Sequence, residues 1–409
     1  MASDPRTGSE LRGAVRVAID ATLAITDLVE AVHRNAERPF AWLAPVHAPM
    51  RAIRALSYGN VRGITRLVGI AIDAALAPLT PWLDQDRAWP GRDALLAALN
   101  GVLGDYLAAT GNPLAIPMSL RYQGAALDLT RLHRNELTPP PTGKIAVFVH
   151  GLCMNDRQWL RRGHGYSRRL ARDLGYTPIF LHYNSGRHIS SNGQDFSAQL
   201  ETLARHWPVE LESIVIIGHS MGGLLARSAC HYAEHERQTW RKKLKTLICI
   251  GSPHHGAPLE RGGNGVDLIL SSNPYTAPFA RLGKIRSAAI TDLRHGSLLD
   301  EDWQGQDRFR RSRLRPQTVP LPAGVQCCAI AASTGKRAGD LNERLLGDGL
   351  VPLDSALGRH GDPARTLAFP ETQQFIAYGV NHLEVLHRPE VYRQIRRWLR
   401  ADDHSGSGD

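Results

Sequence analysis

The spacing of apolar residues changes about a third of the way along the chain. Upstream, apolar positions recur three and four residues apart, from 64 to 75 and again from 94 to 107. This spacing predicts helices with one apolar face, and residues 1–138 are expected to form a helical N-terminal extension. Packing of this extension on the main domain is the plain interpretation. A role at a membrane surface or in binding a partner remains the alternative.

A proline-rich segment, Thr138 to Gly143, ends this helical part, because proline cannot continue a helix. Beyond it, short apolar runs alternate with helical stretches. The predicted strands are 145–149, 178–183, 213–217, 245–250, 325–331 and a sixth candidate at 372–378, and the helices among them include 193–206, 222–236 and 389–400. This alternation predicts a mostly parallel, doubly wound α/β sheet with helices on both faces, over residues 139–402.

A long insertion separates the fourth and fifth predicted strands. Residues 256–322 begin with a glycine-rich stretch and include an arginine-rich run at 308–315. Insertions of this length in a compact domain usually have a function, so we expect a lid or cap over a site, with a disordered loop as the alternative. The acidic, glycine-containing residues 403–409 are predicted to be a flexible tail.

Composition narrows the class of protein. The 409 residues are 43% hydrophobic, which excludes global disorder. The formal net charge of +10 predicts a solvated basic surface, or else contact with anionic membrane surfaces. The five cysteines include no C-x-x-C pair, which disfavours a disulfide framework or a zinc ribbon.

No secretory signal or membrane span is expected from the chain. Asp20 interrupts the only apolar stretch near the N-terminus. The longest apolar region, Gly69 to Leu83, is short and contains Asp73, Pro78 and Pro81. We therefore expect a cytoplasmic protein, soluble or peripheral at a membrane, with reduced thiols.

A G-x-S-x-G turn carries the strongest chemical signal. Gly218 to Gly222 follows the β-branched run at 214–217 and precedes an apolar helix. Such a strand-to-helix turn exposes one serine, Ser220, at the tip of a sharp bend. Gly218 and Gly222 suit the tight turn, where a larger side chain would collide. Ser220 is therefore the candidate nucleophile.

A serine hydroxyl needs a base within reach and a group that orients the base. In doubly wound sheets the nucleophile comes first in the chain, then an acid after a later strand, then a histidine near the C-terminus. Asp348, between two glycines after the fifth predicted strand, and His382, between the last strand and the last helix, fit this order. Asp340 and Asp354 compete with Asp348 as the acid.

The tetrahedral intermediate of acyl transfer needs backbone N–H donors. Met221, which follows the nucleophile, is one predicted donor. The other is expected in the loop after the first strand, where His150-Gly151-Leu152 lies. Leu152 is the predicted residue of this oxyanion hole, and Cys153 is the alternative.

These motifs together resemble the α/β-hydrolase lipases and esterases. They are HGL at 150–152, GHSMGG at 218–223, GSPHHGAPL at 251–259, GDGLVP at 347–352 and GVNHLEVL at 379–386. The resemblance is greatest to the bacterial triacylglycerol-lipase and GPI inositol-deacylase-like branch, and it covers about residues 143–400. It implies an α/β-hydrolase fold, with the triad and oxyanion hole at the residues named above, and it leaves the N-terminal helices unexplained.

The resemblance implies a serine hydrolase that cleaves carboxylic esters, with lipid acyl esters favoured and small soluble esters left open. An acyltransferase or thioesterase with the same triad, or an inactive membrane-associated scaffold, are the alternatives. No cofactor is expected, and no nucleotide-binding motif is present, so we expect no nucleic-acid partner. The adjacent His254 and His255 point different ways on an extended backbone, so they predict pocket structure and no metal site. The sequence leaves the oligomeric state open.

Overall fold

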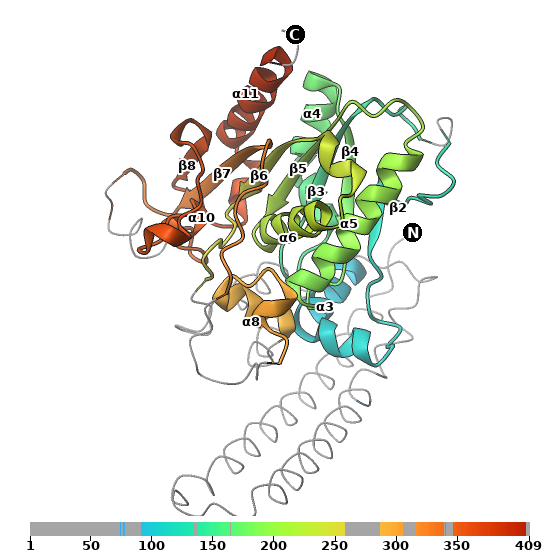
Figure 1. Cartoon of the computed structure of the whole chain (residues 1–409), viewed down its shortest axis with the longest axis horizontal. Helices are drawn as coiled ribbons and strands as arrows, with labels where there is room; N and C mark the ends of the chain where they lie inside the picture. Colours follow the sequence, from blue (N-terminus) through green and yellow to red (C-terminus); the bar gives the residue numbers. More distant parts are fainter. Residues whose placement is uncertain are drawn as a thin grey trace, which may run out of the picture.

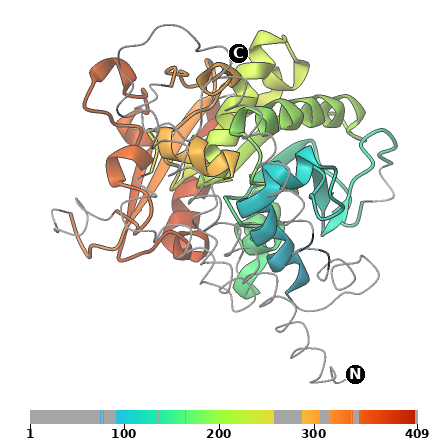
Figure 2. The same cartoon turned by 90° about the horizontal axis from the view of Figure 1, so that it is seen from below.

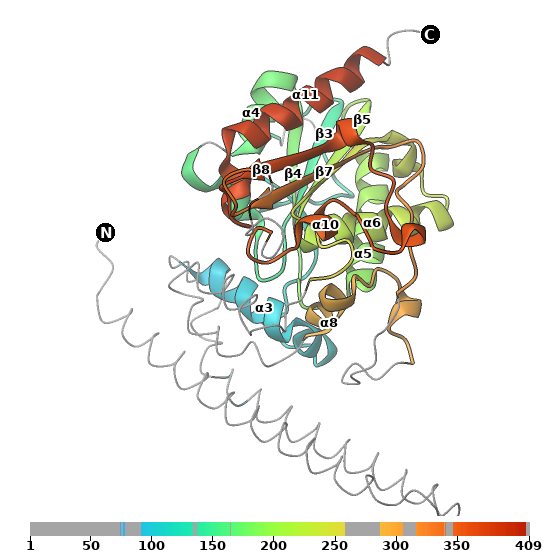
Figure 3. The same cartoon turned by 90° about the vertical axis from the view of Figure 1, so that its left-hand side faces the viewer.

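The computed structural model describes residues 91–133, 137–163, 165–257, 287–305, 316–338, 340 and 347–405, together with the isolated positions 74 and 77. These residues form one eight-stranded sheet with helices on both faces (Figures 1 and 3). The strands are β1 (Ser119–Tyr122), β2 (Ala125–Ala126), β3 (Lys144–Val149), β4 (Thr177–His182), β5 (Ser213–His219), β6 (Leu244–Ile250), β7 (Gln326–Ser333) and β8 (Gln374–Tyr378).

The strand order across the sheet is β2-β1-β4-β3-β5-β6-β7-β8. Strand β1 pairs antiparallel with β2 and with β4, and every other pair is parallel. All six strands predicted from apolar runs are present, within a few residues of their expected bounds. Parallel strands with covered faces need continuous apolar sequences, which is the pattern that predicted them.

The helices are α3 (Arg92–Ala109), α4 (Tyr166–Leu174), α5 (Ile189–His206), α6 (Met221–His235), α8 (Ala288–His295), α10 (Leu353–Ala356) and α11 (Pro389–Ser405). Shorter 3-10 segments are η4 (Asp156–Gly163), η5 (Thr239–Lys243), η7 (Asp300–Asp302), η8 (Pro363–Arg365), η9 (Glu371–Gln373) and η10 (Glu384–His387). Helices α4 and α11 cover one face of the sheet, while α3, α5, α6 and α8 lie on the other (Figure 3).

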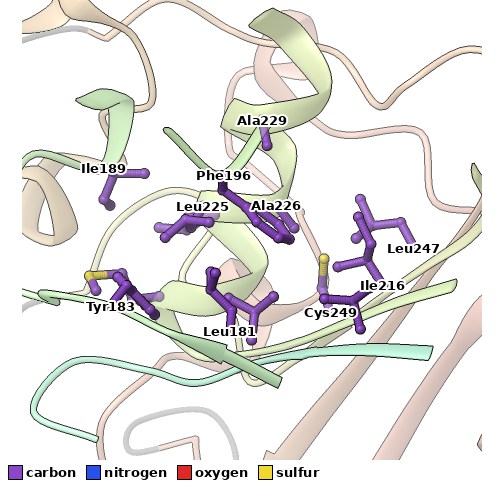
Figure 4. Packing of buried hydrophobic residues seen from close by; sticks show 14 of the residues in the cluster. Leu181, Tyr183, Ile189, Phe196, Ile216, Leu225, Ala226, Ala229, Leu247 and Cys249 are labelled. Carbon is purple, nitrogen blue, oxygen red and sulfur yellow. The ribbon is translucent and has the colours of Figure 1, made fainter. Parts of the chain in front are cut away.

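Two hydrophobic clusters follow from the alternation of side chains along each strand. In β3, Ile145, Val147 and Val149 belong to the cluster under α3, α5 and α6, whereas Ala146 and Phe148 belong to the cluster under α4 and α11. Figure 4 shows part of the first cluster, where side chains of β4, β5 and β6 meet side chains of α5 and α6.

The predicted domain boundary at residue 138 is wrong, because described residues before it belong to the α/β domain. Strands β1 and β2, which lie in the predicted extension, belong to the sheet. Helix α3, which matches the predicted apolar pattern at 94–107, buries Leu95, Leu99 and Leu103 in the same cluster as β3. Residues 91–133 therefore belong to the core of the α/β domain. The predicted helix over 64–75 lies outside the described residues.

The insertion at 256–322 is described in part. Residues 287–305 contain α8 and η7, and α8 packs beside α3 (Figure 2). Residues 258–286 and the arginine-rich run 308–315 lie outside the described residues, so the predicted lid is not tested. The tail predicted from 403 begins later, because α11 continues to Ser405. Within the ranges given above, no helix combines the length and apolar character needed to cross a membrane.

Candidate active site

Ser220 stands at the junction of β5 and α6 with a strained backbone. Its φ is 55° and its ψ is −125°, a conformation that a non-glycine residue keeps only where the surroundings enforce it. A Cβ added at Gly218 would lie 2.5 Å from the backbone N of Gly223, and one at Gly222 would lie 2.3 Å from the Val149 carbonyl oxygen. Both glycines of the motif are therefore required by close backbone packing, as predicted.

Asp348 and His382 form a tight buried pair. His382 Nδ1 lies 2.6 Å from Asp348 Oδ2, and the His382 backbone N–H donates to the Asp348 carbonyl at 3.1 Å. The other carboxylate oxygen, Oδ1, accepts the backbone N–H groups of Leu350 at 2.9 Å and Val351 at 2.8 Å. The carboxylate is thereby fixed from both sides, and both residues are 1% exposed.

The segment after β6 brings this pair next to Ser220. The Ser220 backbone N–H donates to the Ile250 carbonyl at 2.8 Å. A Cβ added at the following residue, Gly251, would lie 3.3 Å from Asp348 Oδ2 and 3.3 Å from His382 Nδ1. Ser220 and the Asp348–His382 pair therefore flank the same short segment at the carboxyl ends of the parallel strands, where ligands bind in open α/β sheets.

The competing carboxylates lie in other surroundings. Asp340 Oδ2 accepts the backbone N–H groups of Lys336 at 2.7 Å and Arg337 at 3.1 Å, so it stabilises its own loop. Asp354 lies in the short helix α10. The carboxylate in contact with His382 is that of Asp348, so the geometry favours Asp348 as the acid.

The loop after β3 lies against Ser220. A Cβ added at Gly151 would be 3.0 Å from the Ser220 Cβ. The next residue, Leu152, is therefore near the nucleophile, whereas the Cys153 N–H donates to Ser185 Oγ at 3.0 Å. An N–H with a protein acceptor is less available to an oxyanion, so the geometry favours Leu152 over Cys153. Met221 is the first residue of α6, and N–H groups in the first turn of a helix have no intrahelical acceptor.

His219 is a site residue to which the sequence reasoning assigned no role. Its Nε2 lies 2.9 Å from the His382 carbonyl oxygen, which can only accept, so Nε2 carries the proton. The two imidazole centroids are 4.7 Å apart. Burial lowers the pKa of His219 well below its usual value, so the ring is neutral. Its place within GHSMGG was the only signal.

His254 and His255 have separate partners. His254 Nδ1 lies 3.2 Å from Arg227 Nη1, and His255 Nε2 lies 2.9 Å from the Gly358 carbonyl oxygen. Across the described ranges, no group of three or more His, Cys, Asp or Glu side chains is placed to hold a metal ion. The five cysteines are buried, and none of them forms a disulfide.

The strand order and the serine elbow define an α/β-hydrolase fold. Residues 140–320, somewhat less than half of the chain, match the family model described as PGAP1-like alpha/beta domain. The strand order, the serine elbow and this match confirm the predicted fold class, an α/β-hydrolase fold. A comparison with curated proteins finds no match.

Several solved structures are similar at low identity. The mature lipase BlEst2 of Bacillus licheniformis is 17% identical, with a TM-score of 0.40 over 63% of this chain and 91% of that one. Esterase Pf2001 of Pyrococcus furiosus is 14% identical, with a TM-score of 0.38 over 64% and 81%. The Listeria innocua lin2722 product is 15% identical, with a TM-score of 0.37 over 63% and 93%. These similarities are too distant to bear on the substrate.

Proposed function

We propose that this protein hydrolyses lipid acyl esters through an acyl-enzyme, with Ser220 as nucleophile, His382 as base and acid, and Asp348 as the orienting carboxylate. The observation that carries the proposal is the 2.6 Å contact between His382 Nδ1 and Asp348 Oδ2 beside the strained serine. The preference for apolar acyl chains comes from the motifs shared with lipases.

The protonation states follow from the contacts. Asp348 accepts a hydrogen bond from the Nδ1–H of His382, which leaves Nε2 with a lone pair for the Ser220 hydroxyl. The Ser220 oxygen attacks the ester carbonyl as its proton passes to Nε2, and the resulting imidazolium is stabilised by the Asp348 charge. Backbone N–H groups of Leu152 and Met221 hold the oxyanion.

Collapse of the tetrahedral intermediate releases the alcohol, which takes the proton from His382. Water then gives its proton to His382 and attacks the acyl-enzyme, and the acid leaves as Ser220 recovers its proton. The backbone conformation of Ser220 keeps its oxygen at the tip of the turn during all of these steps. No step requires a cofactor.

The test is labelling and turnover of Ser220→Ala. We expect kcat on p-nitrophenyl esters to fall by about 10⁴-fold or more, because triad members act as a unit. A fluorophosphonate probe should label the wild type and leave the variant unlabelled. Ser228→Ala is the matched control, since it removes another buried serine hydroxyl, within helix α6, which donates a hydrogen bond to the Leu298 carbonyl at 2.8 Å.

The same assay separates the competing functions. Turnover of Ser220→Ala close to the wild-type value would refute the mechanism, and a folded wild type that takes no label would indicate an inactive scaffold. Products that shift from acid to a new ester when an alcohol is added would indicate an acyltransferase. A series of p-nitrophenyl esters with acyl chains of increasing length tests the preference for lipids.

A further inference from the structure

We propose that Tyr183 and Ser185 position the oxyanion loop, residues 150–153, so that the Leu152 N–H faces the reacting carbonyl. This inference rests on the proposed function and assigns a role to the segment that follows β4. Neither side chain is proposed to touch the substrate. Both act through the backbone of the loop.

The two side chains hold the loop at its two ends. The Tyr183 hydroxyl donates to the His150 carbonyl at 2.7 Å, and its ring stacks on the His150 imidazole with centroids 4.3 Å apart. Ser185 Oγ accepts the Cys153 N–H at 3.0 Å. Leu152 lies between these attachments. Tyr183 and Ser185 are each 1% exposed, so water does not replace either bond readily.

The loop needs such support because its backbone is strained. Cys153 has a φ of 57°, in the left-handed region that L side chains rarely adopt. A conformation of this kind is unfavourable and persists only where neighbours fix it. The hydrogen bond from the Cys153 N–H to Ser185 Oγ holds the peptide plane that directly follows Leu152.

The supporting segment is itself anchored. Asn184 Nδ2 donates to the Gly104 carbonyl at 2.8 Å, and Asn184 Oδ1 accepts the Gly186 N–H at 3.1 Å. Helix α3 approaches the loop so closely that a Cβ at Gly101 would lie 2.2 Å from Cys153 Sγ. The loop is thus packed between α3 and the end of β4, and Figure 4 shows Tyr183 beside Leu181 at that end.

The arrangement predicts a specific kinetic effect. An oxyanion donor contributes only when negative charge develops, so its misalignment lowers kcat and leaves substrate binding unchanged. Loss of one donor in a serine hydrolase costs about 10²–10³ in kcat. Loosening one end of the loop should cost less, about 10-fold for Tyr183→Phe and for Ser185→Ala.

The experiment compares each variant with a matched control in the full chain. Tyr122→Phe removes a tyrosine hydroxyl that donates to the Pro139 carbonyl at 2.8 Å, and Ser197→Ala removes a buried serine bonded to Gln238 at 2.6 Å. Thermal midpoint, kcat, KM and affinity for an aryl trifluoromethyl ketone are measured. This ketone forms a tetrahedral oxyanion with a reactive serine, so it reports on the hole without turnover.

We expect kcat and ketone affinity to fall together by about 10-fold in Tyr183→Phe and Ser185→Ala, with KM unchanged and both controls close to the wild type. Wild-type kcat in folded variants, an equal loss in the controls, or a rise in KM alone would overturn the inference. Tyr183→Phe keeps the ring and its stacking, so it remains decisive if Ser185→Ala does not fold. A wild type without a reactive Ser220 would instead overturn the proposed function and this inference with it.

Discussion

Replacement of Asp348 by asparagine tests the assignment of the acid. The asparagine carbonyl oxygen can take the place of Oδ1 and keep the N–H bonds of Leu350 and Val351. Its NH₂ group then occupies the place of Oδ2, 2.6 Å from His382 Nδ1. Since NH₂ donates, Nδ1 must lose its proton and Nε2 must carry it.

That tautomer cannot accept the Ser220 proton, and the variant also lacks the charge that stabilises the imidazolium. The same substitution in a serine protease lowers kcat by about 10⁴ with the geometry intact. For Asp348→Asn we expect a similar loss, which corresponds to about 5 kcal/mol of transition-state stabilisation. Because the asparagine keeps the hydrogen bonds from the N–H groups of Leu350 and Val351, the fold should persist.

Asp340→Asn provides the matched control, because Asp340 also accepts two backbone N–H groups but faces its own loop. Hydrolysis of p-nitrophenyl esters gives kcat, and thermal unfolding shows whether each variant folds. Activity of Asp348→Asn within 10-fold of the wild type would refute the assignment. A large loss in Asp340→Asn with Asp348→Asn active would move the acid to position 340.

Two further results are expected. Burial lowers the pKa of His150 to about 3, below the 6.5 of an exposed histidine, so the unfolded chain binds more protons between these values and stability falls as pH drops from 6.5 towards 3. Between pH 7.5 and pH 5, the free energy of unfolding from denaturant titrations should fall by about 2 kcal/mol more in the wild type than in His150→Gln, and an equal fall in both would contradict a buried neutral ring. Gly222→Ala should lower both the thermal midpoint and kcat, because its Cβ would lie 2.3 Å from the Val149 carbonyl oxygen, whereas Gly361→Ala, with nothing within 4 Å of its Cβ, should change neither. If Gly222→Ala changed the thermal midpoint and kcat as little as Gly361→Ala, the turn at Ser220 would tolerate displacement of α6 from β3.

Most of the sheet could be predicted because its central strands are buried on both faces. Strands such as β5 are continuous β-branched runs, and the order of the nucleophile, acid and base followed from their places after successive strands. Strand β1 was missed for the opposite reason. Its sequence Ser-Leu-Arg-Tyr buries only Leu120 and Tyr122, and it lies near one edge of the sheet. A four-residue alternation of this kind is too short to distinguish from a loop.

Side-chain contacts between distant segments were not predictable in the same way. The sequence indicated Leu152 as the oxyanion donor and left Cys153 as the alternative. The two candidates are distinguished by Ser185, which lies 32 positions after Cys153 and accepts a hydrogen bond from its N–H. Likewise His219 precedes the nucleophile in the motif, yet its bond to the His382 carbonyl depends on how β5 and β8 place their ends.

The misplaced domain boundary and the unpredicted surroundings of the Leu152 loop have one physical origin. Helix α3 was recognised by its apolar spacing, but that spacing does not say which surface the helix covers. In the structure it covers the loop that holds Leu152, and Gly101 and Gly104 allow it to approach Cys153 and Asn184 closely. The segment before the proline linker therefore forms part of the wall behind the candidate active site, and under our proposal the geometry of the oxyanion hole depends on residues that precede the serine motif in the chain.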